Sequence, residues 1–493
     1  MTAEGELDRR RRAGKPAILA VLPRGEAIRN FVYSGALDDL LSEREVVLAT
    51  VAPSDSVMDD LRARYDRVHE LPSVTERRPV RQVRSLLDVA HGRHIWSEAA
   101  QERWRRRDIE ATTMPARARR VGWKALAIPL ATDRGIELLS RLERATSRRF
   151  PPGTTAADLI DEERPALVFN GSHIHSAIAM PVVQAARWRS VPTATFLFSW
   201  DNLTSQGRLL DVYDHFLAWN EEIADHLLRM YPRITADQVT VTGTPQFDFH
   251  FHPENSLPRE QWAELVGVDP DRPVVLYSTG MANHMPGEPE IVELVADQLA
   301  EMTDLGSPQL LVRVYAKDRT GRFDELRARR PDIAFSPTLW LDEWLTPLPA
   351  DTALWTSTLD QVICGVNIAS TVSLELMMFD KPVVNVAFNP SSIPRHEIDF
   401  ARYYRFDHYR PLVDSGALAL ATDPHSMRIA LREAIQSPGA AAVQRRALLH
   451  EMFGSTLDGR SHERVSRALL DLAVSAAPAP ETSSRRAPQA DHP

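Results

Sequence analysis

The chain has 493 residues, of which 43% are hydrophobic and 25% are charged, and it carries a formal net charge of −9 at pH 7. This length predicts two or three domains with sizeable apolar cores, and the composition excludes a largely disordered or fibrous protein. The negative charge argues against a protein that coats nucleic acid. The single cysteine, Cys364, excludes a disulfide framework and a cysteine-rich metal site, and we expect it to be a buried thiol.

Both ends of the chain are predicted to be disordered tails. Residues 1–14 are charged and show no apolar period, and residues 474–493 are rich in Pro, Ala and Ser. The first residues lack the apolar run of a signal peptide, and no later segment approaches the roughly 18 apolar residues of a membrane span. We therefore expect a cytoplasmic protein.

Short apolar runs alternate with helical patterns between the two tails. They fall into two sets, the first at 17–22, 45–51, 166–171 and 193–198, and the second at 274–279, 310–316, 361–366 and 382–388. Continuous apolar strands that alternate with helices are typical of parallel sheets covered on both faces. The sequence therefore predicts an α/β protein with two Rossmann-like domains that face a cleft.

The two sets are separated by a stretch at 242–258, in which Pro, Gly and Asn interrupt regular structure. We predict an N-terminal domain, a hinge, a C-terminal domain and a last helix, over 15–243, 244–258, 259–457 and 458–473 respectively. In open parallel sheets, ligands bind beyond the carboxyl ends of the strands, so the loops after the apolar runs are the predicted sites.

The loop after the first predicted strand contains Arg24, Gly25 and Glu26. Gly25 frees the backbone there, and Arg24 or Glu26 would point across the cleft. A solvated turn with an ordinary glutamate explains the same residues equally well, so both interpretations stay open.

Residues 101–150 form a basic segment with 13 Arg and Lys against 6 Asp and Glu, interspersed with Trp104, Trp123, Leu126 and Ile128. A basic amphipathic helix can lie on an anionic membrane surface, so residues 103–149 are a candidate for peripheral membrane contact. The alternative is a helix whose charged face is only solvated.

Two later loops of the N-terminal half carry candidates for a catalytic base. His173 and His175 follow the strand at 166–171, and with no third ligand nearby they suit proton transfer better than metal binding. Asp201 follows the strand at 193–198 and could take the proton of an acceptor hydroxyl, although Asp also makes ordinary turns. We rank Asp201 above Glu26 and His173, and we predict no metal site.

Two loops of the C-terminal half are candidates for phosphate contacts. Ser278, Thr279 and Gly280 form a turn directly after a predicted strand. At or beyond the end of the next strand lie cations that could neutralise the phosphates of a nucleotide donor, namely Arg313, Lys317 and Arg319.

The strongest local signal is the run at 365–386, which predicts a strand, a polar turn, a helix and another strand. Ser370 or Thr371 can cap the helix, whose N-terminus would attract phosphate oxygens. Glu375, one turn later, could accept the hydroxyls of a ribose. The alternative is that Ser370, Thr371 and Ser373 only cap and solvate the helix.

This run resembles the nucleotide-binding turn and glutamate of GT-B transferases, especially bacterial surface-carbohydrate and CDP-glycerol glycerophosphotransferase-like enzymes. Further segments resemble the same group in order along about residues 16–472, at 196–208, 216–232, 239–249, 408–424 and 458–470. The resemblance implies a GT-B type fold, with an N-terminal acceptor domain, a C-terminal nucleotide-donor domain and a last helix that packs back on the N-terminal domain.

The resemblance also implies roles for the loops. The loop with Gly25 would border donor phosphates and acceptor, and the turn at 278–280 would face the donor pyrophosphate. Two departures stand out: Asn367 occupies the position of the first of two glutamates found in many retaining enzymes, and the loop after 310–316 lacks a His-Pro pair. The first departure favours an inverting transfer or a phosphotransfer.

The sequence thus predicts a transferase that moves a sugar or a glycerol phosphate from a nucleotide-activated donor to a hydroxyl of a glycan or lipid-linked acceptor. The nucleotide donor is a substrate, and no cofactor and no nucleic-acid partner are expected. Two alternatives stay open, namely a non-hydrolysing UDP-sugar 2-epimerase on the same scaffold and a catalytically silent protein that binds a nucleotide sugar.

Overall fold

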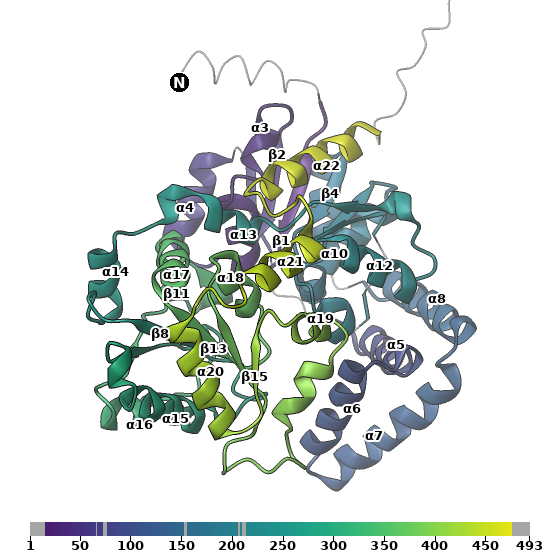
Figure 1. The fold of residues 1–493 in the computed structure, drawn as a ribbon. Helices are drawn as coiled ribbons and strands as arrows, with labels where there is room; N and C mark the ends of the chain where they lie inside the picture. Colours follow the sequence, from purple (N-terminus) through teal and green to yellow (C-terminus); the bar gives the residue numbers. More distant parts are fainter. Residues whose placement is uncertain are drawn as a thin grey trace, which may run out of the picture.

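The computed structural model describes residues 15–65, 67–71, 76–151, 155–205, 208–209 and 213–475. The predicted tail at 1–14 and residues 476–493 of the second tail lie outside these ranges. The chain forms two α/β halves, each built around its own parallel sheet, as the ribbon in Figure 1 shows.

The N-terminal sheet has seven parallel strands in the order β3-β2-β1-β4-β5-β6-β7. Its strands are β1 (Ile18–Leu22), β2 (Val46–Thr50), β3 (Arg67–Glu70), β4 (Leu167–Asn170), β5 (Thr193–Phe196), β6 (His215–Ala218) and β7 (Val239–Val241). The helices of this half are α2 (Gly25–Ile28), α3 (Asp38–Leu41), α4 (Asp55–Arg64), α9 (Thr155–Glu163), α10 (Ser176–Trp188), α11 (Asn202–Ser205) and α12 (Glu221–Met230).

The C-terminal sheet has six parallel strands in the order β10-β9-β8-β13-β14-β15. Its strands are β8 (Val274–Ser278), β9 (Gln309–Arg313), β10 (Ala334–Phe335), β13 (Cys364–Asn367), β14 (Val383–Val386) and β15 (Ala419–Ala421), and a hairpin adds β11 (Trp340–Leu341) and β12 (Thr346–Pro347). Its helices are α14 (Arg259–Val266), α15 (Glu288–Ala300), α16 (Asp324–Arg329), α17 (Pro349–Gln361), α18 (Val372–Met378), α19 (Arg410–Asp414), α20 (Pro424–Gln436) and α21 (Ala442–Phe453).

Every apolar run predicted to be a strand forms one, so the predicted α/β class with two Rossmann-like halves is confirmed. β1, β2, β4, β5, β13 and β14 are buried along their whole length, because helices cover both faces of each sheet. The strands that no apolar run predicted include the edge strands β3, β7, β10 and β15, which are short and only partly buried. Cys364 is buried in β13, and burial raises the pKa of its thiol to about 12.

A helical insertion separates β3 from β4 in the sequence, although β1 pairs directly with β4. It contains α5 (Arg78–Ile95), α6 (Glu98–Glu110), α7 (Met114–Ala127) and α8 (Asp133–Arg149). α5 contacts the other three helices around a small apolar core, and the four helices lie at one side of the molecule in Figure 1. The sequence indicated a basic amphipathic segment here but not a four-helix unit. Among the described helices, none combines the length and the apolar composition needed to cross a bilayer.

The chain passes between the halves through α13 (Pro245–Asp248) and returns in α22 (Ser461–Ser475). α22 packs on α3, α13 and β4, which confirms that the last helix packs back on the N-terminal half. Asp248 caps α22, because its carboxylate accepts hydrogen bonds from the amides of Ser461 (3.1 Å) and His462 (2.8 Å) and from Nδ1 of His462 (2.9 Å). Gly243 has φ +77° and approaches Ser461 so closely that a Cβ would collide with it.

We expect Asp248→Ala to lower the free energy of unfolding by about 1–3 kcal/mol, because it removes a helix cap and leaves buried amides without an acceptor. The hydrogen bond that His462 donates to Asp248 raises the pKa of His462. The interaction that raises this pKa stabilises the folded protein fully at pH values below about 6.5, the pKa of histidine in the unfolded chain. The stabilisation is lost as the pH rises through the higher pKa of His462 in the folded protein. Urea denaturation should therefore show a larger loss at pH 6 than at pH 9.

Asp423→Ala is the matched control, because Asp423 caps α20 through the amides of His425 and Ser426 at an exposed site. Its smaller loss should not change over the same pH range. A loss for Asp248→Ala that equals this control at both pH values would contradict the assignment.

Candidate functional site

Loops at the carboxyl ends of the strands meet at the interface between the two halves. Nζ of Lys317, after β9, lies 3.2 Å from Oε1 of Glu26, after β1. Nε1 of Trp200, after β5, donates to Oγ1 of Thr371, after β13, at 2.9 Å. The structure thus brings together predicted residues that lie far apart in the sequence, as expected for parallel sheets.

Glu26 is a buried carboxylate held among cations. Its carboxylate pairs with Arg24 and with Lys317 of the opposite half. Burial acts to raise the pKa of Glu26, but the charges of Lys317, Arg24 and Arg29 outweigh burial and lower it. Glu26 is therefore ionised but has a low affinity for protons, which makes it a poor general base in this state.

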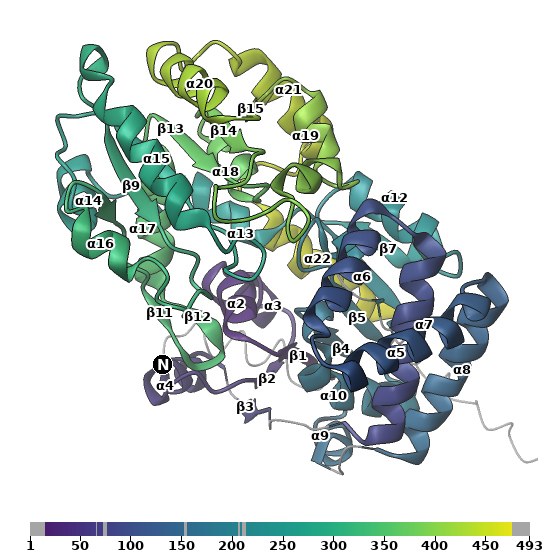
Figure 2. The ribbon, with the colours of Figure 1, turned by 90° about the horizontal axis from the view of Figure 1, so that it is seen from below.

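Gly25 lies against the hairpin β11-β12, and Figure 2 shows α2 beside this hairpin. A Cβ at Gly25 would collide with the backbone and side chain of Thr346. The glycine therefore allows a close approach between the halves, and the backbone that we expected to be open to phosphates is covered by Thr346.

Asp201 makes hydrogen bonds within its own turn. Its Oδ1 accepts from the hydroxyl of Ser199 at 2.6 Å, and its Oδ2 accepts from the hydroxyl of Ser205 at 2.7 Å. This is the ordinary turn geometry that the sequence left open as an alternative. Asp201 nevertheless lies close enough to three histidines to act on each of them by its charge, namely His173, His284 and His408.

The three histidines come from different loops of the two halves. Burial lowers the pKa of His173 to about 4, and burial followed by the charge of Arg106 lowers the pKa of His284 to about 4. Burial also lowers the pKa of His408, whose Nδ1 lies 2.8 Å from the hydroxyl of Thr204. All three rings are therefore neutral at pH 7, and the charge of Asp201 acts to raise the pKa of each. The side chain of His175 lies outside the described part of the chain.

Glu375 lies in α18 with one of its oxygens occupied. Oε2 accepts from Nε1 of Trp355 at 2.7 Å and lies 3.2 Å from Nε2 of His250. Burial acts to raise the pKa of Glu375, but the hydrogen bond from His250 leads the effects that lower it. His250 belongs to the predicted hinge, so the position of Glu375 is linked to the crossing between the halves.

The polar turn before α18 divides between the interface and the core. Thr371 faces the N-terminal half through Trp200, and the hydroxyl of Ser370 accepts from the amide of Val372 at 3.3 Å. The hydroxyl of Ser373 is fully buried and lies 2.8 Å from that of Tyr409 and 3.1 Å from Oδ1 of Asn367. The nucleotide contact expected of Ser373 does not fit this burial, and Thr371 begins the helix without a side-chain cap.

The turn after β8 is satisfied by the protein itself. The hydroxyl of Thr279 accepts from the amide of Tyr315 at 2.9 Å, and the amide of Gly280 donates to both oxygens of Glu288 at 3.0 Å. Burial raises the pKa of Glu288 to about 7, although its ion pair with Arg322 opposes the rise. Ser278 is buried at the end of β8. An internal carboxylate thus takes the position at Gly280 where we expected a phosphate.

The three cations predicted after β9 differ in their surroundings. Arg313 is buried and pairs with Asp351 at 2.6 Å. This ion pair belongs to the interior of the C-terminal half, so Arg313 is not placed to contact a nucleotide. Arg319 pairs with Asp342 at 2.6 Å in an exposed position. Lys317 alone points to the opposite half, where it contacts Glu26.

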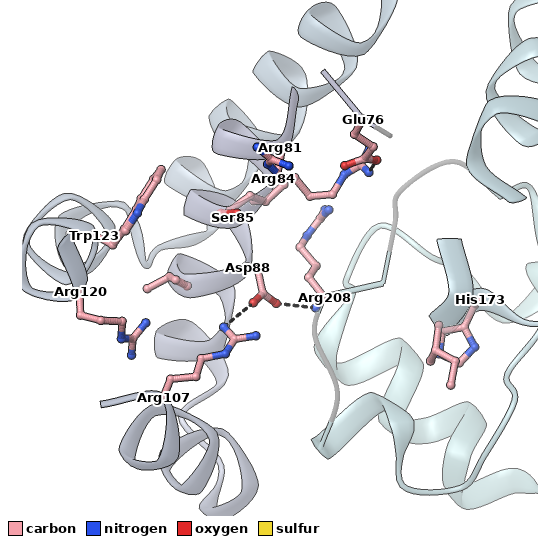
Figure 3. A pocket seen from close by; sticks show the side chains of 13 residues that line it. Glu76, Arg81, Arg84, Ser85, Asp88, Arg107, Arg120, Trp123, His173 and Arg208 are labelled. Carbon is pink, nitrogen blue, oxygen red and sulfur yellow. Dashed lines mark hydrogen bonds and ion pairs between the residues drawn. The ribbon is translucent and has the colours of Figure 1, made fainter. Parts of the chain in front are cut away.

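A cavity of about 470 Å³ lies in the N-terminal half, between the helical insertion and the loop after β4. Figure 3 shows its charged wall, with Asp88 between Arg107 and Arg208 and with His173 on the opposite side. Its lining residues are Glu76, Arg81, Arg84, Ser85, Leu87, Asp88, Val89, Arg107, Arg120, Trp123, His173, Ile174 and Arg208. We call it the arginine pocket. Within the described ranges, no group of three or more His, Cys, Asp or Glu side chains is placed to hold a metal ion.

Several residues of this interface could not be predicted from the sequence. Arg29, His284 and Glu288 fall inside or beside loops that the sequence singled out, but nothing in a single sequence separates them from neighbouring polar residues. His408 and Trp355 come from segments between strands, and only the fold brings them to the interface.

No family model matches the chain, and no curated protein is significantly similar to it in sequence. Solved structures are similar in fold. The UDP-GlcNAc 2-epimerase from Neisseria meningitidis, bound to UDP-GlcNAc, gives a TM-score of 0.52 at 12% identity, covering 92% of this chain and 100% of that chain. MnaA of S. aureus, solved with UDP, gives 0.51 at 14% identity, covering 93% of this chain and 97% of that one.

The fold is of the GT-B type. At these identities the likeness establishes the fold alone. The wall teichoic acid polymerase TagF gives a TM-score of 0.47 at 8% identity, covering 96% of this chain and 93% of that one, a likeness too weak to bear on function.

The buried histidines of the GT-B interface make stability depend on pH. The pKa values of His173 and His284 are about 4 in the folded protein, whereas an unfolded chain has a histidine pKa of about 6.5. Between pH 4 and pH 6.5 the unfolded state therefore binds more protons than the folded state, and the free energy of unfolding rises with pH. Acidification from pH 6.5 towards pH 4 should lower the free energy of unfolding by roughly 1–3 kcal/mol for each of His173 and His284. Urea denaturation at several pH values measures this loss.

His173→Gln and His284→Gln should each give a shallower dependence on pH. His396→Gln is the control, because the side chain of His396 is 80% exposed. Slopes that match the wild type in both buried variants would show that these rings are solvated in the folded protein.

Proposed function

We propose that the protein is a GT-B transferase that moves a sugar or a glycerol phosphate from a nucleotide-activated donor to a hydroxyl of a second substrate. The observation that supports this most is the arginine pocket beside His173, in the N-terminal half. A transferase needs a site for an acceptor apart from its donor site, whereas an epimerase acts on one substrate and needs no such site.

The donor would bind to the C-terminal half around α18. Within the described chain, oxygen Oε1 of Glu375 has no hydrogen-bond partner, while Oε2 is held by Trp355 and His250. A carboxylate with one oxygen held in place and the other without a partner is suited to accept hydrogen bonds from ribose hydroxyls. Ser370 and Thr371 lie one turn earlier, on the side of the interface.

The donor pyrophosphate would compete with Glu26 for Lys317. The internal carboxylate neutralises this lysine while the halves are in contact. The pyrophosphate of such a donor carries two negative charges against the one of a carboxylate, and it makes equally strong charge-assisted hydrogen bonds. Donor binding would therefore release Glu26 from Lys317 and change the contact between the halves, which is the movement that a hinge at 244–258 allows.

The catalytic base would come from the pair Asp201 and His173. His173 lines the arginine pocket, and its Nδ1 lies 3.2 Å from both the carbonyl oxygen of Phe196 and the amide nitrogen of Phe198. That geometry fixes the ring. The ring is neutral and can take the proton of an acceptor hydroxyl once its pKa rises from about 4, and the charge of Asp201 acts in that direction.

A UDP-GlcNAc 2-epimerase is the second candidate, because the similar solved structures named above include a protein with that name. Such an enzyme would change the sugar of UDP-GlcNAc with no acceptor present. Three carboxylates of this interface are engaged within the protein while the halves are in contact: Glu26 and Glu288 in ion pairs, and Asp201 in hydrogen bonds within its own turn. This arrangement favours the transferase.

Glu375→Gln should weaken binding of the preferred nucleotide by about 5- to 150-fold, equivalent to roughly 1–3 kcal/mol for a hydrogen bond to a charged group. A nucleotide panel in a thermal-shift screen identifies that ligand, and calorimetry then measures its affinity. Glu293→Gln is the control, because Glu293 forms an exposed ion pair with Arg329. Equal affinities in the two variants would remove Glu375 from the donor site.

Incubation with UDP-GlcNAc alone, followed by NMR of the sugar, separates the two candidate reactions. We expect no change in the sugar until an acceptor is added. Conversion of the sugar without an acceptor would establish the epimerase instead.

A further inference from the structure

We propose that the arginine pocket is the acceptor site and that the acceptor carries a phosphate ester. The inference rests on the proposed transferase function, since it names the chemical class of the second substrate. It is carried by the charges around the cavity, by one arginine without a partner, and by the position of His173 in the wall.

The cavity is surrounded by more cations than carboxylates. Asp88 is shared between Arg107 (3.1 Å), the more distant Arg103 (3.8 Å) and the amide of Arg208 (3.0 Å). Among the described residues, the charged lining residues and their direct ion-pair partners are six cations and four carboxylates: Arg81, Arg84, Arg103, Arg107, Arg120 and Arg208 against Glu76, Asp88, Asp108 and Glu143. An anionic ligand would offset this surplus of positive charge.

Arg81 is a cation of the pocket lining that a ligand can reach. Its side chain lines the pocket, is exposed, and has no hydrogen-bond or ion-pair partner among the described residues. The charge of Arg208 acts further into this half, where burial, followed by that charge, lowers the pKa of His91 to about 3. An exposed guanidinium without a partner among the described residues is suited to hold an oxyanion.

The chemistry of the lining points to a phosphate ester attached to a polyol or sugar. Guanidinium groups bind phosphate oxygens in a bidentate manner, and several of them suit a group with more than one charge. Trp123 offers an aromatic face for the carbon-bound part of such a ligand. Because His173 lies on the opposite side of the cavity in Figure 3, a hydroxyl of the bound ester would lie toward the candidate base.

The test is calorimetry of the full chain with sn-glycerol 3-phosphate, with glycerol as the uncharged probe and no nucleotide present. We expect binding of the phosphate ester and none of glycerol. Arg81→Gln should weaken binding about tenfold or more, the effect of losing a charged hydrogen bond. This variant should fold normally, because Arg81 has no hydrogen-bond or ion-pair partner in the described part of the chain. Arg467→Gln is the control, because Arg467 is an exposed arginine of α22 and lies outside the pocket lining.

The inference would be overturned if glycerol phosphate bound with equal affinity to the wild-type protein, to Arg81→Gln and to Arg467→Gln. Displacement of glycerol phosphate by the preferred nucleotide would also overturn it, since the pocket would then belong to the donor. The result does not depend on turnover, so failure of transfer with every nucleotide donor would count against the proposed function alone. Competition by vesicles that contain phosphatidic acid would identify a lipid-borne ester, and its absence a soluble one.

A different surface supports a second inference independently. Exposed large apolar side chains gather on one segment of the insertion: Ile109, Met114, Val121, Leu126, Ile128, Leu138, Leu142 and Phe150. These are eight of the fifteen such side chains in the described chain, so their grouping is not an even scatter over the surface. α7 and α8, which carry most of them, lie at the outer edge of the molecule in Figure 1.

The apolar residues of α7 follow one face. Met114, Ala118, Val121 and Ala125 are spaced by four, three and four residues, and none of them is covered by another element. Exposed arginines flank the face, including Arg119 on α7. We infer that α7 and α8 dock on an anionic membrane surface. A second copy of the chain fits this face less well, because two identical basic segments would repel each other.

Co-sedimentation with vesicles tests this surface. The full chain should bind vesicles of equal parts phosphatidylglycerol and phosphatidylcholine, and not phosphatidylcholine alone, and added salt should weaken the binding. Val121→Gln and Leu126→Gln should each reduce binding several-fold. Val443→Gln, which changes a valine of similar exposure on α21 (69% against 66%), should leave it unchanged. Failure to bind either vesicle, or a dimer that dissociates in Val121→Gln, would overturn the inference.

Discussion

The contact between the two halves depends on a buried carboxylate and the cations around it. Glu26, at the end of the first strand, pairs with Arg24 of its own loop and with Lys317 of the opposite half. Leaving one charge of such a group unpaired in the interior would cost several kcal/mol, so the pairing ties the position of one half to that of the other. Close packing of Gly25 on Thr346 is possible only in the same arrangement.

Elsewhere at the interface, carboxylates of the protein also contact groups to which the phosphates of a nucleotide could bind. Glu288 binds the amide of Gly280, and Glu26 binds Lys317. If the donor binds as we propose, its pyrophosphate would replace these internal partners. Stability and ligand binding are then coupled through a few charges, and the neutral histidines nearby make that coupling sensitive to acid.

The helical insertion gives the N-terminal half two features. Its inner side forms one wall of the arginine pocket, and α7 and α8 expose an apolar stripe to the outside. Trp123 lies on the helix that carries both, since α7 lines the pocket with this residue and exposes Val121 beside it. An acceptor presented at a membrane surface would therefore be close to the pocket that we propose holds its phosphate.

The sequence alone determined the two α/β halves, because buried parallel strands need continuous apolar runs and those runs are visible without the fold. It could not find edge strands such as β3 and β15, which bury few side chains and leave a weak pattern. The tertiary structure decided which polar residues meet: it turned Ser373 and Arg313 to the core, and it brought His284 and His408 beside Asp201. The reason is that the hydrophobic pattern of a strand depends on the burial of that strand alone, whereas the partner of a charge can come from a loop far away in the sequence, as Lys317 does for Glu26.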